Sequence, residues 1–144
     1  CDRRLKDGSF IEEPGCEAYT PLWTRIATQA QVDSMLPMLQ ATAQFPRKPF
    51  PTIAADNPKY NPRGYWRGPI WLDQTYFAIR GLRNYGYNQL ADEYTLQVFD
   101  RLSGLKEGAP IHENYGTHTG ERLKAPHFSW SSSHLLMMYD DYGK

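Results

Sequence analysis

The stretch from Ile70 to Tyr85 constrains the fold of this chain more than any other. It has helical spacing, it stops before Gly86, and Pro69 is suited to the first turn of a helix. Its apolar residues lie on most sides of such a helix: Ile70, Trp71, Leu72, Tyr76, Phe77, Ala78, Ile79, Leu82 and Tyr85. A helix that is apolar on most sides is buried on most sides. Other helices must therefore surround it.

The segments that follow predict those helices. Asn88 can cap an amphipathic helix that runs to about Leu102, with its polar side toward solvent. Residues 130–142 predict a second buried helix, with Ser129 as its capping residue. An alternation of buried and amphipathic helices fits two concentric rings of helices, with the loops gathered at one end.

The first third of the chain has less regular patterns. Residues 1–24 carry no apolar period and are expected to be irregular. Residues 24–39 predict a helix, with a kink or break at Pro37. We find no alternating strand pattern longer than a few residues. The predicted fold class is therefore all-α.

Charge and hydropathy exclude several classes of function. The chain has 16 Lys and Arg residues against 16 Asp and Glu residues, so its net charge is zero. With no basic run, it is not expected to bind nucleic acid. It contains no apolar stretch of the ~20 residues needed to span a bilayer, so no membrane insertion is expected. Cys1 and Cys16 can form a small-loop disulfide or remain free thiols, and the compartment stays open, with a periplasmic or secreted location preferred.

Residues 45–69 are rich in proline, with aromatic residues between the prolines. Ordered loops of this length usually build functional surfaces. The adjoining stretch YWRGPIWLD places Tyr65, Trp66 and Trp71 close to Arg67 and Asp73. Proteins hold sugars with such sets, because C–H faces stack on the rings and hydroxyl groups bond to the charged groups. The alternative is an aromatic core with a structural Arg–Asp pair.

The stretch PIHENYGTHTG places one carboxylate, Glu113, among an imidazole, an amide and a phenol. A carboxylate that activates water must stay ionised and hold the water by a hydrogen bond, and neighbouring amide and hydroxyl donors serve both needs. Gly116 and Gly120 allow the backbone to turn sharply nearby. Taken alone, the stretch leaves three roles open for Glu113: catalytic base, metal ligand, or solvated carboxylate of a turn.

The remaining polar residues do not favour other chemistry. The chain has four histidines but no HExxH, CxxC or His-x-His pattern, so no metal and no cofactor is expected. The serines at 129 and 131–133 lack the GxSxG pattern of a nucleophile and lie where a helix should start. Helix capping and close helix packing explain them better than catalysis.

Three separately spaced motifs resemble the C-terminal end of glycoside hydrolase family 63, and more narrowly its bacterial α-glucosidase branch. They are YWRGPIW at 65–71, PIHENY at 110–115 with Thr119-Gly120, and Ala125-Pro126 with FSWS at 128–131. The resemblance covers the chain from about Cys16 to Tyr142. This family includes the eukaryotic processing α-glucosidase I and bacterial mannosylglycerate hydrolases.

The resemblance implies an (α/α)6 toroidal barrel and hydrolysis of α-linked sugars with inversion at the anomeric carbon. It assigns Glu113 as the general base. The expected substrate-binding residues are Tyr65, Trp66, Arg67, Trp71, Asp73, Tyr115 and Trp130. No position in the chain matches the motif of the family's general acid. The chain also has Gly116-Thr117-His118 where the commoner pattern is ENYNPxTG, a change that can alter the first sugar subsite.

Because twelve helices need more than 144 residues, residues 1–144 are expected to be the C-terminal portion of the catalytic domain. The remainder of that domain is then an obligatory partner, and the chain alone should be inactive. The expected substrate is an oligosaccharide or small α-glycoside, cleaved by an exo-acting α-glucosidase. An open barrel would expose the flanks of the helices at 70–85 and 130–142. A non-catalytic carbohydrate-binding or scaffold segment and a sugar epimerase on the same toroidal fold remain as alternatives.

Overall fold

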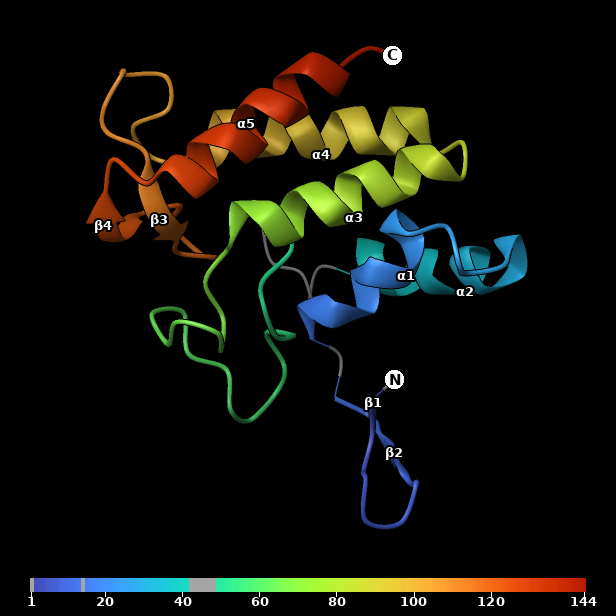
Figure 1. Cartoon of the computed structure of the whole chain (residues 1–144). Coiled ribbons are helices and arrows are strands. Elements are labelled where there is room, and N and C mark those ends of the chain that lie inside the picture. The colour runs from blue at the N-terminus through green and yellow to red at the C-terminus, as the bar shows by residue number, and fades with distance from the viewer. Residues whose placement is uncertain (1, 14, 42–48) are drawn as a thin grey trace.

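The computed structural model describes residues 2–13, 15–41 and 49–144, and this part of the chain is mostly helical. Helix α3 (Leu72–Asn84) lies at the centre of the molecule (Figure 1). Three helices pack against it: α1 (Thr20–Trp23), α4 (Asn88–Arg101) and α5 (Ser129–Asp141). The predicted central buried helix is thus confirmed.

Helix α3 starts two residues later than its apolar pattern indicates. Trp71 is its extended N-cap residue, and Ile70 forms an antiparallel bridge with Tyr115 instead of a helical turn. The Ile70 N–H donates to the Tyr115 carbonyl at 2.7 Å, and the Tyr115 N–H donates back at 3.0 Å. Pro69 therefore precedes the helix and does not form its first turn. This bridge joins the start of α3 to a strand far along the chain.

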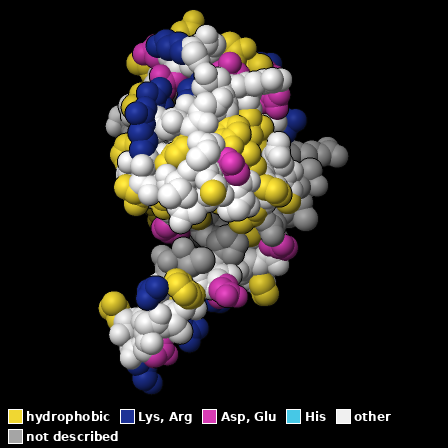
Figure 2. Space-filling model, turned by 90° about the vertical axis from the view of Figure 1, so that its right-hand side faces the viewer, with side chains coloured by type: hydrophobic (Ala, Val, Ile, Leu, Met, Phe, Trp, Pro, Cys, Tyr) yellow, Lys and Arg dark blue, Asp and Glu magenta, His cyan; other side chains and the backbone are white. Residues whose placement is uncertain are grey.

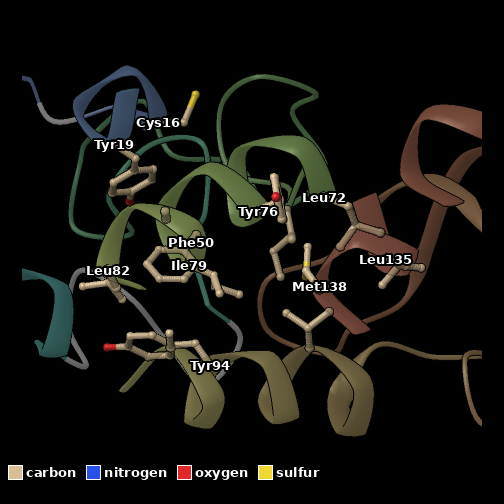
Figure 3. Packing of buried hydrophobic residues seen from close by; sticks show 14 of the residues in the cluster. Cys16, Tyr19, Phe50, Leu72, Tyr76, Ile79, Leu82, Tyr94, Leu135 and Met138 are labelled. Carbon is tan, nitrogen blue, oxygen red and sulfur yellow. The ribbon is translucent and has the colours of Figure 1, made fainter. Parts of the chain in front are cut away.

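The core lies where α3 meets its neighbours (Figure 3). The Phe50 ring packs edge-on between two tyrosine rings, 5.3 Å from Tyr19 and 4.9 Å from Tyr94 between ring centroids. Helices α1 and α3 approach closely at Gly81, where an added Cβ would lie 2.6 Å from the Leu22 Cβ. Gly81 is therefore required by the distance between the two helices.

The predicted amphipathic helix is confirmed as α4, with Asn88 as its first helical residue and Tyr87 at the capping position. Helix α5 likewise starts at Ser129 and has Phe128 at its N-cap, so the predicted capping roles of Asn88 and Ser129 are wrong. Ser129 lies inside the first turn, where it cannot cap the helix.

Helix α5 is less buried than its composition indicates. It buries Ser131, Leu135 and Met138, whereas five large apolar side chains on or just after it are exposed: Trp130, Leu136, Met137, Tyr139 and Tyr142. The predicted exposed flank is therefore found on α5. It is not found on α3, where eight residues are buried and Phe77 stacks under the Trp23 ring with centroids 4.2 Å apart.

The all-α prediction is wrong in two places, because the described residues include two small antiparallel sheets. Strands β1 (Asp2–Arg3) and β2 (Phe10–Ile11) form a hairpin that stands out from the helical body (Figure 2). Strands β3 (His112–Tyr115) and β4 (Arg122–Pro126) form the second sheet. Strands of two to five residues are too short to show a period of two in the sequence.

Residues 1–24, predicted to be irregular, also form a 3₁₀-helix (Cys16–Tyr19) and α1. Helix α2 (Gln29–Gln40) starts at a capping box made by Thr28 and Gln31, and it continues three residues past Pro37. The predicted break at Pro37 is therefore wrong. No helix of the described residues is long and apolar enough to cross a membrane.

Cys16 is buried and forms no disulfide with another described residue, and burial, with help from the nearby Glu17 and Asp73 carboxylates, raises the pKa of its thiol to about 12. Cys1 lies outside the described residues, so a bridge between the two cysteines stays a prediction.

Candidate active site

Glu113 is the second residue of strand β3, and its side chain is half-buried. The turn of this hairpin lies at residues 116–121, so Glu113 belongs to a strand and not to the loop tip. Its Oε1 accepts a hydrogen bond of 2.6 Å from the phenol of Tyr65. Among the described residues, no lysine or arginine forms an ion pair with it. The carboxylate is thus held by one neutral donor.

Two contacts fix the backbone that carries Glu113. On one side, the bridge between Ile70 and Tyr115 ties β3 to the segment before α3. On the other side, the hydroxyl of Ser131, in the first turn of α5, donates to the Glu113 carbonyl at 3.0 Å. Strand β3 is therefore held between the starts of two helices. This contact gives Ser131 a role across the fold, which the prediction of capping and close packing does not include.

The β3–β4 pairing is irregular next to Glu113. His112 pairs with Pro126 and Asn114 with Leu123, so β4 contains one residue more than β3 over this interval. Within this interval Lys124 has a φ of 61°, a left-handed conformation. Its ammonium group lies 5.9 Å from the centre of the Tyr65 ring. Bulges redirect side chains, and this one brings a cation beside the ring that contacts Glu113.

An aromatic cluster lies beside the carboxylate. The Trp66 and Trp71 rings stack with centroids 4.1 Å apart and planes 6° from parallel. Trp71 is buried and also contacts the rings of Tyr65 at 5.0 Å and Trp130 at 5.8 Å, both edge-on. The three outer rings, those of Tyr65, Trp66 and Trp130, are exposed. A buried indole therefore supports three exposed rings, and one of them, Tyr65, bonds to Glu113. We call Tyr65, Trp66, Trp71 and Trp130 the aromatic platform.

Three predicted substrate-binding residues lie outside this platform. Asp73 is only 3% exposed, and its carboxylate accepts a hydrogen bond of 2.7 Å from its neighbour Gln74. Tyr115 is fully buried, and its phenol oxygen accepts a hydrogen bond of 3.0 Å from the His112 N–H. The structure therefore places Asp73 and Tyr115 in the interior, because α3 and strand β3 bury these positions. Arg67 is exposed.

The proline-rich loop is tied to the β3–β4 hairpin at several points. The phenol oxygen of Tyr60 shares a hydrogen bond with the buried Thr117 hydroxyl. The same oxygen lies 3.2 Å from His118 Nε2. The Arg63 guanidinium donates two hydrogen bonds, of 2.9 and 2.6 Å, to Glu121. These bonds lower the pKa of the Glu121 carboxyl. The departure from the ENYNPxTG pattern thus lies where the hairpin meets this loop.

Sequence patterns could not reveal these ties, because the partners are separated by many residues. Tyr65 and Glu113 lie 48 residues apart, and Tyr60 and Thr117 lie 57 apart. Ser131 could have been singled out only through its place in the FSWS motif. No group of three or more His, Cys, Asp and Glu residues suited to a metal ion occurs in the described part of the chain.

Comparison with known proteins identifies the family of the chain. The sequence model of one protein family, the mannosylglycerate hydrolase MGH1-like glycoside hydrolase domain, matches residues 1–131 of the chain. Mannosylglycerate hydrolase MGH1 from Selaginella moellendorffii is 26% identical over 136 residues, which is 92% of this chain and 27% of that protein.

Solved structures show the same fold. The family 63 mannosylglycerate hydrolase from Thermus thermophilus, in complex with glucose, matches 94% of this chain and 33% of its own length, with 24% identity and a TM-score of 0.77. The same enzyme in complex with Tris and D-glycerate gives the same TM-score. The neutral trehalase Nth1 from Saccharomyces cerevisiae matches 99% of this chain, with 15% identity and a TM-score of 0.73.

The likeness to these helical barrels shows the fold, and the chain spans about a third or less of each of these relatives. The family model covers most of the chain and agrees with the three motifs. The chain therefore belongs to the mannosylglycerate hydrolase MGH1-like glycoside hydrolases of family 63, the family that its motifs predict.

Proposed function

We propose that this chain supplies the general base, Glu113, and the sugar-binding platform of an inverting hydrolase of small α-glycosides. One observation carries the proposal: the Glu113 carboxylate bonds to Tyr65, an exposed member of the aromatic platform, and this neutral phenol is its only bonded partner among the described residues. A carboxylate locked to an arginine would have little basicity left for water. Glu113 has no such partner in the described residues, and its half-buried position leaves it accessible.

The chemistry follows from that arrangement. The oxygen of a water molecule attacks the anomeric carbon while its proton passes to the Glu113 carboxylate. The bond from that carbon to the aglycone oxygen breaks, and this oxygen takes a proton from a general acid on the opposite side of the sugar. Inverting enzymes separate the two carboxyl groups by roughly 6.5–9.5 Å to leave room for the water. Attack from the face opposite the leaving group inverts the anomeric centre.

The acid would come from the remainder of the catalytic domain. No position in this chain matches the family's general acid, and the one carboxylate near the platform in sequence, Asp73, is buried in the interior. We therefore expect residues 1–144 to bind sugar weakly and to hydrolyse no glycoside when produced alone. Turnover would require the rest of the domain, supplied in the same chain or as a partner.

Trp66 and Trp130 are suited to hold the sugar. Both rings are exposed and both are supported by the buried Trp71. The C–H faces of a pyranose can pack on such rings, as apolar surfaces pack on aromatic side chains elsewhere. Arg67 is exposed and close in sequence, and its guanidinium can donate to sugar hydroxyl groups.

The relatives favour a glycoside of a small hydroxy acid over the glucosides of an α-glucosidase. The Selaginella and Thermus proteins are mannosylglycerate hydrolases, and one Thermus structure holds D-glycerate. We propose mannosylglycerate as the first substrate to test, with glucosylglycerate beside it, because another Thermus structure holds glucose. The aglycone would lie on the acid side of the sugar, away from Glu113.

The test uses the intact protein that contains this chain. Release of glycerate from both substrates would be measured for the wild type, Glu113→Gln and a matched control, Glu121→Gln. Glu121 is a carboxylate of the same hairpin, but it is bonded to Arg63 and not to the platform. We expect Glu113→Gln to lower kcat by roughly 10²–10⁴-fold, the usual contribution of a general base, with little change in KM. Glu121→Gln should keep most of the activity.

Two further measurements separate a base from a structural residue. Proton NMR of the first product should show the anomer opposite to that of the substrate. Azide needs no deprotonation, so it should restore turnover in Glu113→Ala and give a glycosyl azide of inverted configuration. Near-normal turnover by Glu113→Gln would defeat the proposal, and sugar binding that still depended on Trp66 would then favour a non-catalytic carbohydrate-binding segment.

A further inference from the structure

Tyr65 has an unusual backbone conformation for a residue other than glycine. Its φ is 62°, in the left-handed region that residues other than glycine rarely occupy. Such conformations cost roughly 1–3 kcal/mol and gather at functional sites. Here the Trp71 indole N–H donates to the Tyr65 carbonyl at 3.1 Å, and the two rings meet edge-on at 5.0 Å. The buried Trp71 therefore holds Tyr65 in this conformation.

The conformation directs the Tyr65 phenol to Glu113. The oxygen–oxygen distance of 2.6 Å is that of a hydrogen bond from a hydroxyl group to a charged carboxylate. This bond to Glu113 raises the pKa of Tyr65 above its ordinary value. The phenol consequently keeps its proton throughout the neutral range, and it stays a donor wherever the enzyme would work.

We propose that Tyr65 is a positioning residue that orients the carboxylate of Glu113 toward the attacking water; this rests on the proposed function. The Glu113 side chain has three rotatable bonds, and it is only half-buried. The phenol binds Oε1 and leaves the second oxygen to receive the proton of the water. The resemblance to family 63 implies a sugar contact for Tyr65, whereas its polar group is directed at the base.

A structural role is the competing explanation, because Tyr65 also ties the proline-rich loop to the hairpin. Tyr60 provides a matched control. It lies in the same loop, and its phenol also bonds to the hairpin, but its partner is the Thr117 hydroxyl. If the loop tie alone mattered, Tyr60→Phe and Tyr65→Phe would have similar effects. If orientation of the base matters, only Tyr65→Phe should reduce the rate.

The experiment compares Tyr65→Phe, Tyr60→Phe, Glu113→Gln and the double variant Tyr65→Phe/Glu113→Gln in the intact protein, with mannosylglycerate or glucosylglycerate, whichever the wild type cleaves faster. We expect Tyr65→Phe to lower kcat by about tenfold, a part of the roughly 10²–10⁴-fold contribution of a base, with KM changed less than about threefold. The kcat of Tyr60→Phe should stay within about twofold of the wild-type kcat, because its phenol does not contact Glu113. The double variant should be no slower than Glu113→Gln, because a residue that acts through Glu113 has nothing left to orient.

Several results would overturn the inference. Wild-type kcat in Tyr65→Phe, a raised KM with unchanged kcat, or a further loss in the double variant would each assign Tyr65 to another role. An equal loss in Tyr60→Phe, or loss of the fold in Tyr65→Phe, would assign the phenol to stability. These outcomes leave the base itself untouched, since the proposed function is tested separately by Glu113→Gln, by the anomer of the first product and by azide rescue of Glu113→Ala.

Discussion

Replacement of Asp92 by asparagine should destabilise the protein more than any other single charge removal among its described ion pairs. Asp92 in α4 pairs with Arg83 in the last turn of α3. The Arg83 side chain is only 4% exposed and that of Asp92 is 28% exposed. Asp92 also accepts a hydrogen bond of 3.1 Å from the Gly143 N–H, beyond α5. One carboxylate thus joins α3, α4 and the segment that follows α5.

The magnitude follows from this burial. Removal of one partner of a buried ion pair costs about 3–5 kcal/mol, because the other charge is left without compensation. Water reaches the Asp92 side of this pair, so we expect roughly 2–3 kcal/mol. At about 2–4 °C per kcal/mol for a protein of this size or larger, the melting temperature should fall by roughly 5–10 °C.

The assay is urea denaturation followed by far-UV circular dichroism, with a thermal scan beside it. Asp100→Asn is the matched control, because Asp100 pairs with Lys106 at 2.8 Å but their side chains are 57% and 63% exposed. An exposed pair contributes about 0–1 kcal/mol. Losses within about 0.5 kcal/mol of each other in the two variants would refute the argument from burial, since such a difference is near the limit of the method.

The pH dependence gives an independent check. Burial opposes the charge on Asp92, but the hydrogen bonds from Arg83 and the Gly143 N–H prevail and lower its pKa. A lowered pKa means that the unfolded chain takes up the proton first as the pH falls. The stability from Asp92 is therefore present above about pH 4, the ordinary value for Asp, and is lost as the pH falls through the lower folded value. The gap between the wild type and Asp92→Asn should close in that range.

Two further predictions concern Gly120 and Cys16. Gly120 has a φ of 71°, and an added Cβ would lie 2.0 Å from the Arg101 carbonyl oxygen, so Gly120→Ala should cost about 2–4 kcal/mol in urea denaturation. Gly108→Ala, with a φ of 66° and open space around it, should cost only about 1–2 kcal/mol; equal losses would show that the clash is absent. Because burial raises the pKa of Cys16 to about 12, its thiol stays protonated in mildly alkaline buffer, and in a Cys1→Ser variant it should react with a disulfide reagent far more slowly when folded than in guanidinium chloride. Complete native labelling within minutes would contradict the burial of Cys16.

The local patterns of the sequence were sufficient for the central helices. The signals for α3 and α4 are the spacing of their apolar residues and the glycine after α3, and each is a relation between residues close in sequence. Both helices could therefore be predicted to within about two residues. The spaced motifs also led to Glu113 and to the three tryptophans of the platform. These features are local, or they are short motifs that can be compared one at a time.

Only the tertiary structure decided how these residues are used. The pairing of Ile70 with Tyr115 moved the start of α3, buried Tyr115 and placed Glu113 in a strand. The bond from Tyr65 to Glu113 is a contact across 48 residues, and the buried Trp71 holds the left-handed conformation of Tyr65. Periodicity records which side of an element is apolar, but not which distant element meets it. Hydrogen-bond partners and register are therefore set when the elements pack together, because only packing selects among the many pairings that the same local patterns allow.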